Sequence, residues 1–240
     1  MKRLAGHQTY FFPYIGFFTV LNSSDIFIYG DELQYEKKSW MNRNRIIGED
    51  GKIRYFTVPL KKAKIKTPTN KMEICYHKDW QQDILNQLGY YKKRAPYYDD
   101  VVEMLKCLFA QKHHYLSELA IDSVDVTLQK LGIKEKKIIK MSELELNPPE
   151  NIVADEWGLY MCEYFKDEHI DTFINAPGGK GFYDVSKYEA HGIKTEFLQN
   201  NLRPYDQGLD VFAEGLSIID VLMFNSTEEV RDMINDYHLI

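Results

Sequence analysis

The alternation of apolar segments in residues 1–32 limits the fold of this chain more than any other feature. Residues 2–7 suit a short strand, and Pro13 suits the first turn of a helix, because its φ is preset and it has no N–H to leave unpaired. The helix expected over 14–24 is followed by DIFIYGDE at 25–32, a continuous apolar run typical of a strand buried on both faces. Strand, helix and strand in this length predict the βαβ unit of a parallel sheet.

The rest of the chain extends this pattern around a helical segment. A third strand is expected at 53–60, and helical spacing then dominates about 79–132, with Gly132 closing the last helix. Afterwards we expect strands at 136–142, 171–176 and 193–198 and helices at 154–165, 184–192, 216–225 and 226–239. Ser226 and Glu229 form a capping box for the last helix. The sequence therefore predicts one α/β domain over 1–240, with a Rossmann-like, mostly parallel sheet, flanking helices and a helical insertion at about 79–132.

The composition is that of a folded protein, which we expect in the cytoplasm. The 240 residues are 44% hydrophobic, with a net charge of −6. Cys75, Cys107 and Cys162 are far apart, show no metal-binding spacing, and are expected as reduced core residues. The N-terminus has no apolar region of a signal peptide, and no apolar run reaches about 18 residues, so we expect neither export nor a transmembrane segment.

Positive charge is concentrated in one part of the chain. Residues 1–70 contain 12 Lys and Arg against 6 Asp and Glu, and residues 52–71 contain seven Lys and Arg with no acidic residue. Such a run is commonly a solvated loop. The alternative is contact with a polyanion, which would be a nucleotide phosphate, tRNA or an anionic membrane surface. Lys61 in this run is a candidate phosphate contact.

His7 and Gln8 follow the first predicted strand, where the chain turns toward the first helix. In an open parallel sheet, ligands bind at the carboxyl ends of the strands. A histidine in that place suits acid–base catalysis near neutral pH. A structural role is the alternative, with His7 capping the helix or packing under the aromatic residues that follow it.

Polar side chains also follow the second predicted strand. Asp31 comes directly after it, where a carboxylate would act as a base or bind Mg²⁺. The next residues combine amide, cationic and aromatic groups, which suit hydrogen bonding, phosphate contact and stacking; they are Gln34, Tyr35, Trp40, Asn42, Arg43, Asn44 and Arg45. A solvent-facing strand is the alternative explanation of this stretch.

The two strands should bring their polar residues together, because parallel strands end at the same edge of a sheet. We expect one cleft shared by His7, Gln8, Asp31, Gln34, Asn42 and Arg43, with Trp40 as an apolar wall. A glycine-rich segment, NAPGGKG at 175–181, follows a later strand. It lacks the GxxxxGK[ST] phosphate-loop pattern, so we interpret it as a loop at the ligand edge.

Several motifs resemble one known family in order and spacing over nearly the whole chain. They are GHQTYFFPYIGFF at 6–18, DELQYEKKSWMNRNRI at 31–46, RPYDQ at 203–207 and LSIIDVLMFN at 216–225. The resemblance is to the WbqC-like family. Thr9 and Tyr14 replace the proline and tryptophan usual in the family, and the glycine-rich segment differs from the usual Ser-Gly-x-Gly-Ala.

The resemblance implies both a function and a set of site residues. WbqC-like proteins occur in bacterial lipopolysaccharide, O-antigen and surface-polysaccharide biosynthesis and are described as glycine or aminoacyl transferases. The family motifs fall on His7, Gln8, Tyr10, Pro13, Asp31, Gln34, Tyr35, Trp40, Asn42, Arg43, Asn44, Gln207, Ser217 and Asp220. Gln207 and Asp220 are expected beside the cleft or bracing it.

The favoured hypothesis is a cytoplasmic transferase that acylates, or glycylates, an amino sugar carried on a nucleotide. His7 would be the acid–base catalyst, Asp31 a second one or a metal ligand, and Arg43, Arg45 and Lys61 the phosphate contacts. An activated acyl donor is required, and its identity is open.

Two other functions remain open. One is a non-catalytic protein that binds a sugar nucleotide or a glycan-assembly enzyme. The other is an ATP-dependent ligase like the nucleotidylyltransferases, using ATP with Mg²⁺, although Tyr10 stands where their HxxH motif has its second His. Apart from a tRNA acyl donor, we expect no stable nucleic-acid partner.

Overall fold

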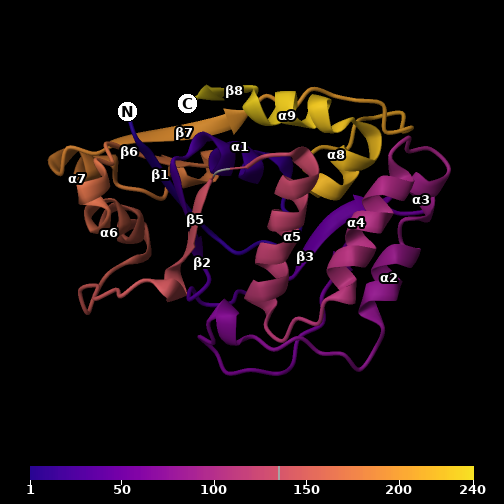
Figure 1. Cartoon of the computed structure of the whole chain (residues 1–240), viewed down its shortest axis with the longest axis horizontal. Helices are drawn as coiled ribbons and strands as arrows, with labels where there is room; N and C mark the ends of the chain where they lie inside the picture. Colours follow the sequence, from indigo (N-terminus) through magenta and orange to yellow (C-terminus); the bar gives the residue numbers. More distant parts are fainter. Residues whose placement is uncertain (135) are drawn as a thin grey trace.

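The computed structural model describes residues 1–134 and 136–240 and has the predicted α/β fold. In these residues the main sheet has six strands in the order β5-β2-β1-β6-β7-β8. Five strands run parallel and β8 is antiparallel to β7. The strands are β1 (Arg3–Gln8), β2 (Ile26–Gly30), β5 (Lys137–Lys140), β6 (Thr172–Asn175), β7 (Lys194–Asn200) and β8 (Tyr237–Leu239) (Figure 1).

Helices cover both faces of this sheet, because alternate residues of its buried strands point to opposite sides. Ala5 of β1 and Phe27 of β2 belong to the core that includes α1 and α9, whereas Leu4 and Ile28 pack with α6 and α7. The flanking helices are α1 (Ile15–Ser23), α6 (Trp157–Tyr164), α7 (Val185–Ala190) and α9 (Thr227–Asn235), whereas α8 (Ile218–Phe224) packs against α4 and β3. Short 3₁₀ helices occupy Thr69–Lys71, Met141–Glu143, Ala154–Glu156, Lys166–Glu168 and Pro177–Gly179.

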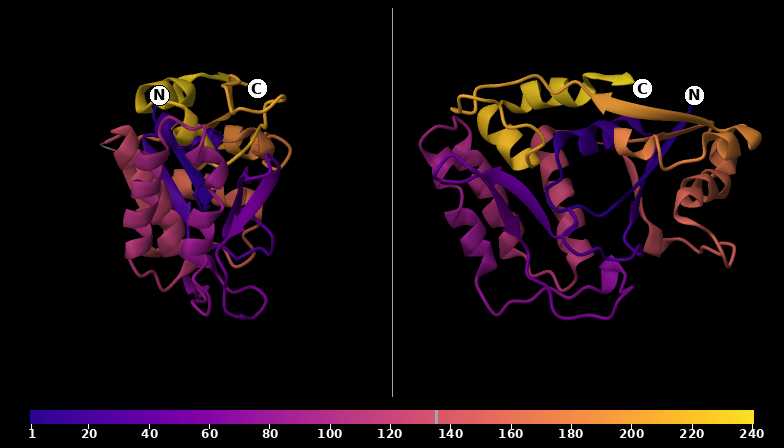
Figure 2. Two further views of the ribbon diagram at one scale, coloured as in Figure 1. Left: turned by 90° about the vertical axis from the view of Figure 1, so that its right-hand side faces the viewer. Right: turned by 180° about the vertical axis from the view of Figure 1, so that it is seen from behind.

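The predicted helical insertion is present between β4 and β5. It consists of α2 (Trp80–Asn86), α3 (Gly89–Lys92), α4 (Tyr98–Ala110) and α5 (Leu116–Leu131). Gly132 ends α5 with a φ of 66°, the left-handed conformation that favours glycine. Helices α2, α3 and α4 lie at one end of the molecule and α6 and α7 at the other (Figures 1 and 2). In the described residues, we find no helix of the length and hydropathy needed to cross a membrane.

Three features differ from the sequence-based expectations. The strand expected at 53–60 is shorter, β4 (Ile53–Thr57), and pairs with β3 (Arg43–Ile47) in a separate antiparallel hairpin. The last helix ends at Asn235, and the residues after it form β8, which pairs with the free edge of β7. The Asn200 side chain of β7 donates to the Met233 carbonyl in the last turn of this helix. Cys107 is exposed on α4 rather than in the core.

Candidate functional site

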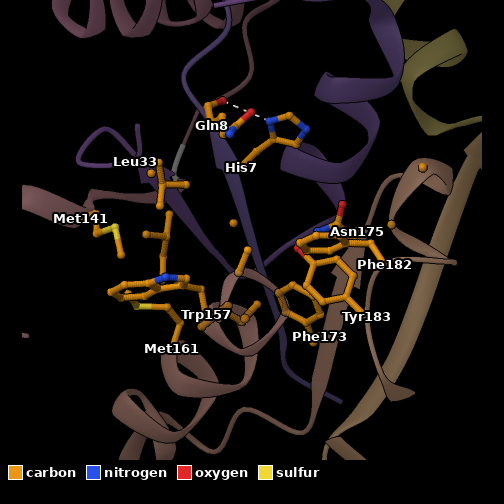
Figure 3. A pocket seen from close by; sticks show the side chains of 18 of the residues that line it. His7, Gln8, Leu33, Met141, Trp157, Met161, Phe173, Asn175, Phe182 and Tyr183 are labelled. Atoms are coloured by element: carbon orange, nitrogen blue, oxygen red, sulfur yellow. Dashed lines mark hydrogen bonds between the residues drawn. The ribbon is translucent and has the colours of Figure 1, made fainter. Parts of the chain in front are cut away.

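A cavity of about 580 Å³ opens at the carboxyl ends of β1, β2 and β6. From β1, the chain first builds β2 and β5 on one side and later places β6 on the other. The loops after β1 and β6 therefore diverge, which leaves a crevice where open α/β sheets bind ligands. Figure 3 shows the side chains that point into this crevice.

The floor of the cavity is one face of the sheet. Leu4 and Gly6 of β1, and Ile28 and Gly30 of β2, are two residues apart and so share this face. The two glycines leave space where other residues would project a side chain. Above the floor, α6 packs closely against Phe173 of β6 because Gly158 has no side chain. A Cβ added at Gly158 would lie 2.6 Å from the Phe173 ring.

The aromatic wall comes from α6, from β6 and from the segment after β6. Trp157 stands on one side and Phe173, Phe182 and Tyr183 stand on the other (Figure 3). Asn175, the last residue of β6, donates from Nδ2 to the Tyr183 hydroxyl at 2.9 Å. Burial raises the pKa of Tyr183 to about 12, so this phenol stays protonated.

Part of this wall was missed from the sequence. The glycine-rich segment lies at this edge of the sheet, and its Gly178 and Gly179 line the cavity. Asn175 and Tyr183 were not predicted. The available signal for Asn175 was an amide at the end of a buried strand, the same signal that identified Gln8.

His7 lies at the rim of the cavity, at the end of β1. Its ring packs edge-on against Tyr10 and Phe17, with centroids 4.6 and 5.1 Å away. Its Nδ1 is 3.0 Å from the Gln8 carbonyl oxygen, which only accepts, so Nδ1 carries the proton. Burial lowers the pKa of His7, and this hydrogen bond only partly opposes the shift. The imidazole is therefore neutral near pH 7, with Nε2 as its basic nitrogen.

Three further candidate site residues, Gln8, Tyr10 and Gln34, also line the cavity. The Tyr10 hydroxyl donates to Gln8 Oε1 at 3.3 Å. Burial raises the pKa of Tyr10 to about 12, so it too stays protonated. Glu36 adds a carboxylate to this side of the cavity.

Comparison with known proteins identifies the family. The model of the WbqC-like protein family matches residues 8–232. The chain belongs to this family. An uncharacterized protein of Mycobacterium tuberculosis, Rv1507c, is 24% identical to it over 236 residues, which covers 98% of each chain. No solved structure matches the chain.

In this WbqC-like protein Asp31 does not share the cavity of His7, contrary to expectation. Its carboxylate accepts hydrogen bonds from the Ser142 backbone N–H at 3.0 Å and from the Ser142 hydroxyl at 2.6 Å. It lines a second, polar cavity of about 480 Å³ together with His113 and Asp122. The two hydrogen bonds from Ser142, which also lines the second cavity, hold the Asp31 side chain there.

The asparagines of the family motif are buried and bind backbone. Asn42 donates to the Val58 carbonyl at 2.9 Å and accepts from the Tyr35 hydroxyl at 3.1 Å. Asn44 donates to the Phe12 carbonyl at 2.8 Å. Asn44 thus holds the β3–β4 hairpin against the turn after β1, whereas Asn42 links the start of β3 to the residue after β4. Neither asparagine nor Tyr35 lines the cavity.

Gln207 and Asp220 form a buried network that braces the hairpin. Asp220 is fully buried and accepts from the Tyr91 and Tyr205 hydroxyls, each at 2.6 Å, and from Gln207 Nε2 at 2.7 Å. Burial raises the pKa of Asp220, which these three donors oppose. Tyr91 also accepts from the Ile47 N–H of β3 at 2.9 Å, so the network reaches the hairpin directly.

The predicted cationic and stacking residues lie outside the cavity of His7. Trp40, Arg43 and Arg45 gather on the outer face of the hairpin with Tyr55. Lys61 pairs with Glu73 on the surface at 2.5 Å. The residues expected in one cleft therefore lie in four places, which are the cavity of His7, the second cavity, the buried hydrogen-bond networks and the outer face of the hairpin.

Proposed function

We propose that this WbqC-like protein is a transferase that acylates an amino sugar, and that the cavity at the β1–β6 crevice binds this sugar. The observation that carries the proposal is the state of His7. Its Nδ1–H is committed to the Gln8 carbonyl, and Nε2 has no hydrogen-bond partner among residues 1–134 and 136–240. A neutral imidazole with an unbonded Nε2 is suited to accept a proton from an attacking amine.

The lining of the cavity supports a sugar as the ligand. Its volume of about 580 Å³ is in the range of small-molecule sites. The aromatic residues provide flat apolar surfaces, while Gln8, Gln34, Asn175 and Glu36 provide hydrogen-bonding groups. A sugar ring presents both an apolar face and hydroxyls, so it complements this mixture.

In the proposed acyl transfer, His7 acts as the base. The amine nitrogen of the sugar would attack the carbonyl carbon of an activated acyl group, which is a thioester, acyl phosphate, acyl adenylate or aminoacyl ester. A C–N bond forms, and the bond to the leaving group breaks with its electron pair. The amine proton moves to Nε2 of His7 and then to the leaving group, so the imidazole returns to its neutral state.

A nucleotide carrier would extend beyond the cavity. The described residues that line it include no Lys or Arg, so the cavity itself suits the uncharged part of a substrate. The diphosphate of a nucleotide-linked sugar would lie at the mouth, toward solvent. The phosphate roles predicted for Arg43, Arg45 and Lys61 would require such an extended ligand.

Ligand-dependent stabilisation followed by turnover tests this proposal. Nucleotide-linked amino sugars, ATP with Mg²⁺ and acyl-CoA would be screened by thermal shift, because a ligand at about 100 times its Kd stabilises by roughly 2.7 kcal/mol. With a bound sugar and an acyl donor, mass spectrometry would detect the amide product. His7→Gln should lower kcat by about a hundredfold or more with little change in sugar affinity. His191→Gln, at an exposed histidine outside the cavity wall, is the control.

The same experiment separates the rival functions. Full turnover by His7→Gln would refute the catalytic assignment. Binding without product, with affinity lost in His7→Gln, would identify a binding protein instead. Release of pyrophosphate from ATP in the presence of the free carboxylic acid that is to be transferred would favour the ligase.

A further inference from the structure

The outer face of the β3–β4 hairpin carries four side chains that stack on one another. Trp40 and Tyr55 are stacked with ring centroids 6.2 Å apart and planes 23° apart. The Arg43 guanidinium lies over the Tyr55 ring at 4.4 Å, and that of Arg45 lies over the Trp40 ring at 5.4 Å. We refer to Arg43, Tyr55, Trp40 and Arg45 as the stacking ladder.

The ladder faces solvent because of the period-two pattern of the hairpin. Asn44 and Phe56 point inward and are buried, whereas Arg45 and Tyr55, which pair directly across the strands, point outward. Despite their mutual contacts, Trp40 is 36% exposed and Tyr55 is 48% exposed. Two large rings on an open surface are not explained by the packing of the core.

The arginines of the ladder keep their charge uncompensated. Arg43 donates from Nη2 to the Lys38 carbonyl, and Arg45 donates to the Gly215 carbonyl at 2.7 Å. Neither forms a salt bridge with a described residue. Stacking and carbonyl contacts fix the planes of both half-buried guanidinium groups, and their positive charges stay uncompensated by a described carboxylate.

The segment around the ladder is strongly basic in an otherwise acidic chain. Residues 37–71 contain 11 Lys and Arg against 2 Asp and Glu, a net charge of +9, so with −6 overall the rest of the chain carries −15. Among these residues, Arg54 pairs with Asp50 and Lys61 pairs with Glu73. Lys62, Lys64 and Lys66 are exposed in the loop that follows the hairpin. This separation of charge favours a polyanionic partner.

We propose that the outer face of the β3–β4 hairpin binds single-stranded nucleic acid. Bases stack on exposed aromatic rings and on guanidinium planes, and phosphates are bound by Arg and Lys, which is the combination that this face presents. The hairpin forms the stacking surface, and Lys62, Lys64 and Lys66 supply charge for the backbone of the strand. This inference departs from our expectation of no stable nucleic-acid partner, and it does not depend on the proposed acyl transfer.

Fluorescence anisotropy with a labelled uridylate RNA of about 12 nucleotides, and with its thymidylate DNA counterpart, tests this proposal. The double variant Trp40→Ala/Tyr55→Ala should weaken binding by roughly tenfold or more, because each stacked base contributes strongly to affinity. The hydrogen bond from the Phe11 N–H to Trp40 is made to its backbone carbonyl, so this substitution leaves it in place. Arg43→Lys/Arg45→Lys keeps the charge but removes the planar stacks, and it should give a smaller loss with an unchanged salt dependence.

Charge variants report on the phosphate contacts. Replacing Lys62, Lys64 and Lys66 by Gln should reduce the slope of log affinity against log salt by about 2, since each phosphate contact to a single strand contributes about 0.7. The control replaces the exposed Lys92, Lys93 and Lys106 by Gln, which removes the same charge elsewhere and should leave the slope unchanged.

Three outcomes would overturn the proposal. The first is no binding of either oligonucleotide at about 50 mM salt. The second is binding that Trp40→Ala/Tyr55→Ala leaves intact, which would place the contact elsewhere. The third is binding to vesicles of phosphatidylserine and phosphatidylcholine but not to the oligonucleotides, which would identify a membrane-binding surface. Circular dichroism of each variant would establish that it is folded.

Discussion

The side-chain amide of Asn44 donates a 2.8 Å hydrogen bond to the carbonyl oxygen of Phe12, a buried residue with a φ of 41°. Ser217 donates to the same carbonyl at 2.7 Å, and Ser123 accepts from the Phe12 N–H at 3.0 Å. A positive φ is uncommon for a residue other than glycine. Side chains from three distant segments therefore stabilise the turn that follows His7 and Gln8.

We expect Asn44→Asp to destabilise the protein by about 2–4 kcal/mol. The substitution keeps the size of the side chain but directs a carboxylate oxygen at the Phe12 carbonyl, with no donor between them. Urea unfolding at neutral pH measures the loss. Asn151→Asp, at an exposed position, should change stability by less than about 0.5 kcal/mol. Equal effects of the two substitutions would show that Asn44 does not stabilise this turn.

The network around Asp220 should be sensitive to the loss of its acceptor. Asp220→Asn turns an N–H toward hydroxyl donors in a site closed to water, and we expect a loss of about 2–3 kcal/mol. Tyr205→Phe removes one donor and leaves two, so its cost should be about 1 kcal/mol. Thermal unfolding of both variants provides the comparison. A larger loss from Tyr205→Phe would contradict the central role of the carboxylate.

The order of elements could be predicted from the sequence because it depends on local periodicity. The β1–α1–β2 unit, the insertion that ends at Gly132 and the capping box at Ser226 all follow from patterns within a few residues. The position of His7 and Gln8 at the carboxyl end of β1 followed from the same unit. The pairing of β3 with β4 could not be predicted, because the polar residues of β3 obscured its strand pattern.

The separation of the expected site residues could not be predicted, because it depends on the side of the strand to which each side chain points and on hydrogen-bond partners that are distant in the sequence. The sequence placed Asp31 at the correct edge of the sheet, but its side chain turns toward Ser142, which is far along the chain. Asn44 of β3 and Asn42 just before it donate to backbone carbonyls inside the molecule, whereas Arg43 and Arg45 point outward. The partner of Asn44, the Phe12 carbonyl, belongs to a turn whose unusual φ leaves no mark in the sequence.

The close packing of Gly158 of α6 against Phe173 and Tyr188 gives a further prediction. A Cβ at Gly158 would lie 2.5 Å from the Tyr188 hydroxyl and 2.6 Å from the Phe173 ring. Gly158→Ala should therefore destabilise the protein by about 1–2 kcal/mol through overpacking, despite the higher helix propensity of alanine. At Gly178 an added Cβ meets no atom within 4 Å, so Gly178→Ala should have little effect in the same urea unfolding experiment. Similar stabilities of the two variants would show that α6 can shift away from Phe173 and Tyr188 at little cost.

The titration of His7 tests the basis of the proposed mechanism. Burial lowers its folded-state pKa below the ordinary value of 6.5. The unfolded chain therefore binds the His7 proton more readily, and stability is lost as the pH falls below 6.5 until it reaches the folded-state pKa. Between about pH 8 and about pH 5, the free energy of unfolding of the wild type should fall relative to that of His7→Gln. NMR of the imidazole would measure the pKa directly. A pKa above 6.5, or a stability difference that does not depend on pH, would remove the argument for a neutral base at the rim of the cavity.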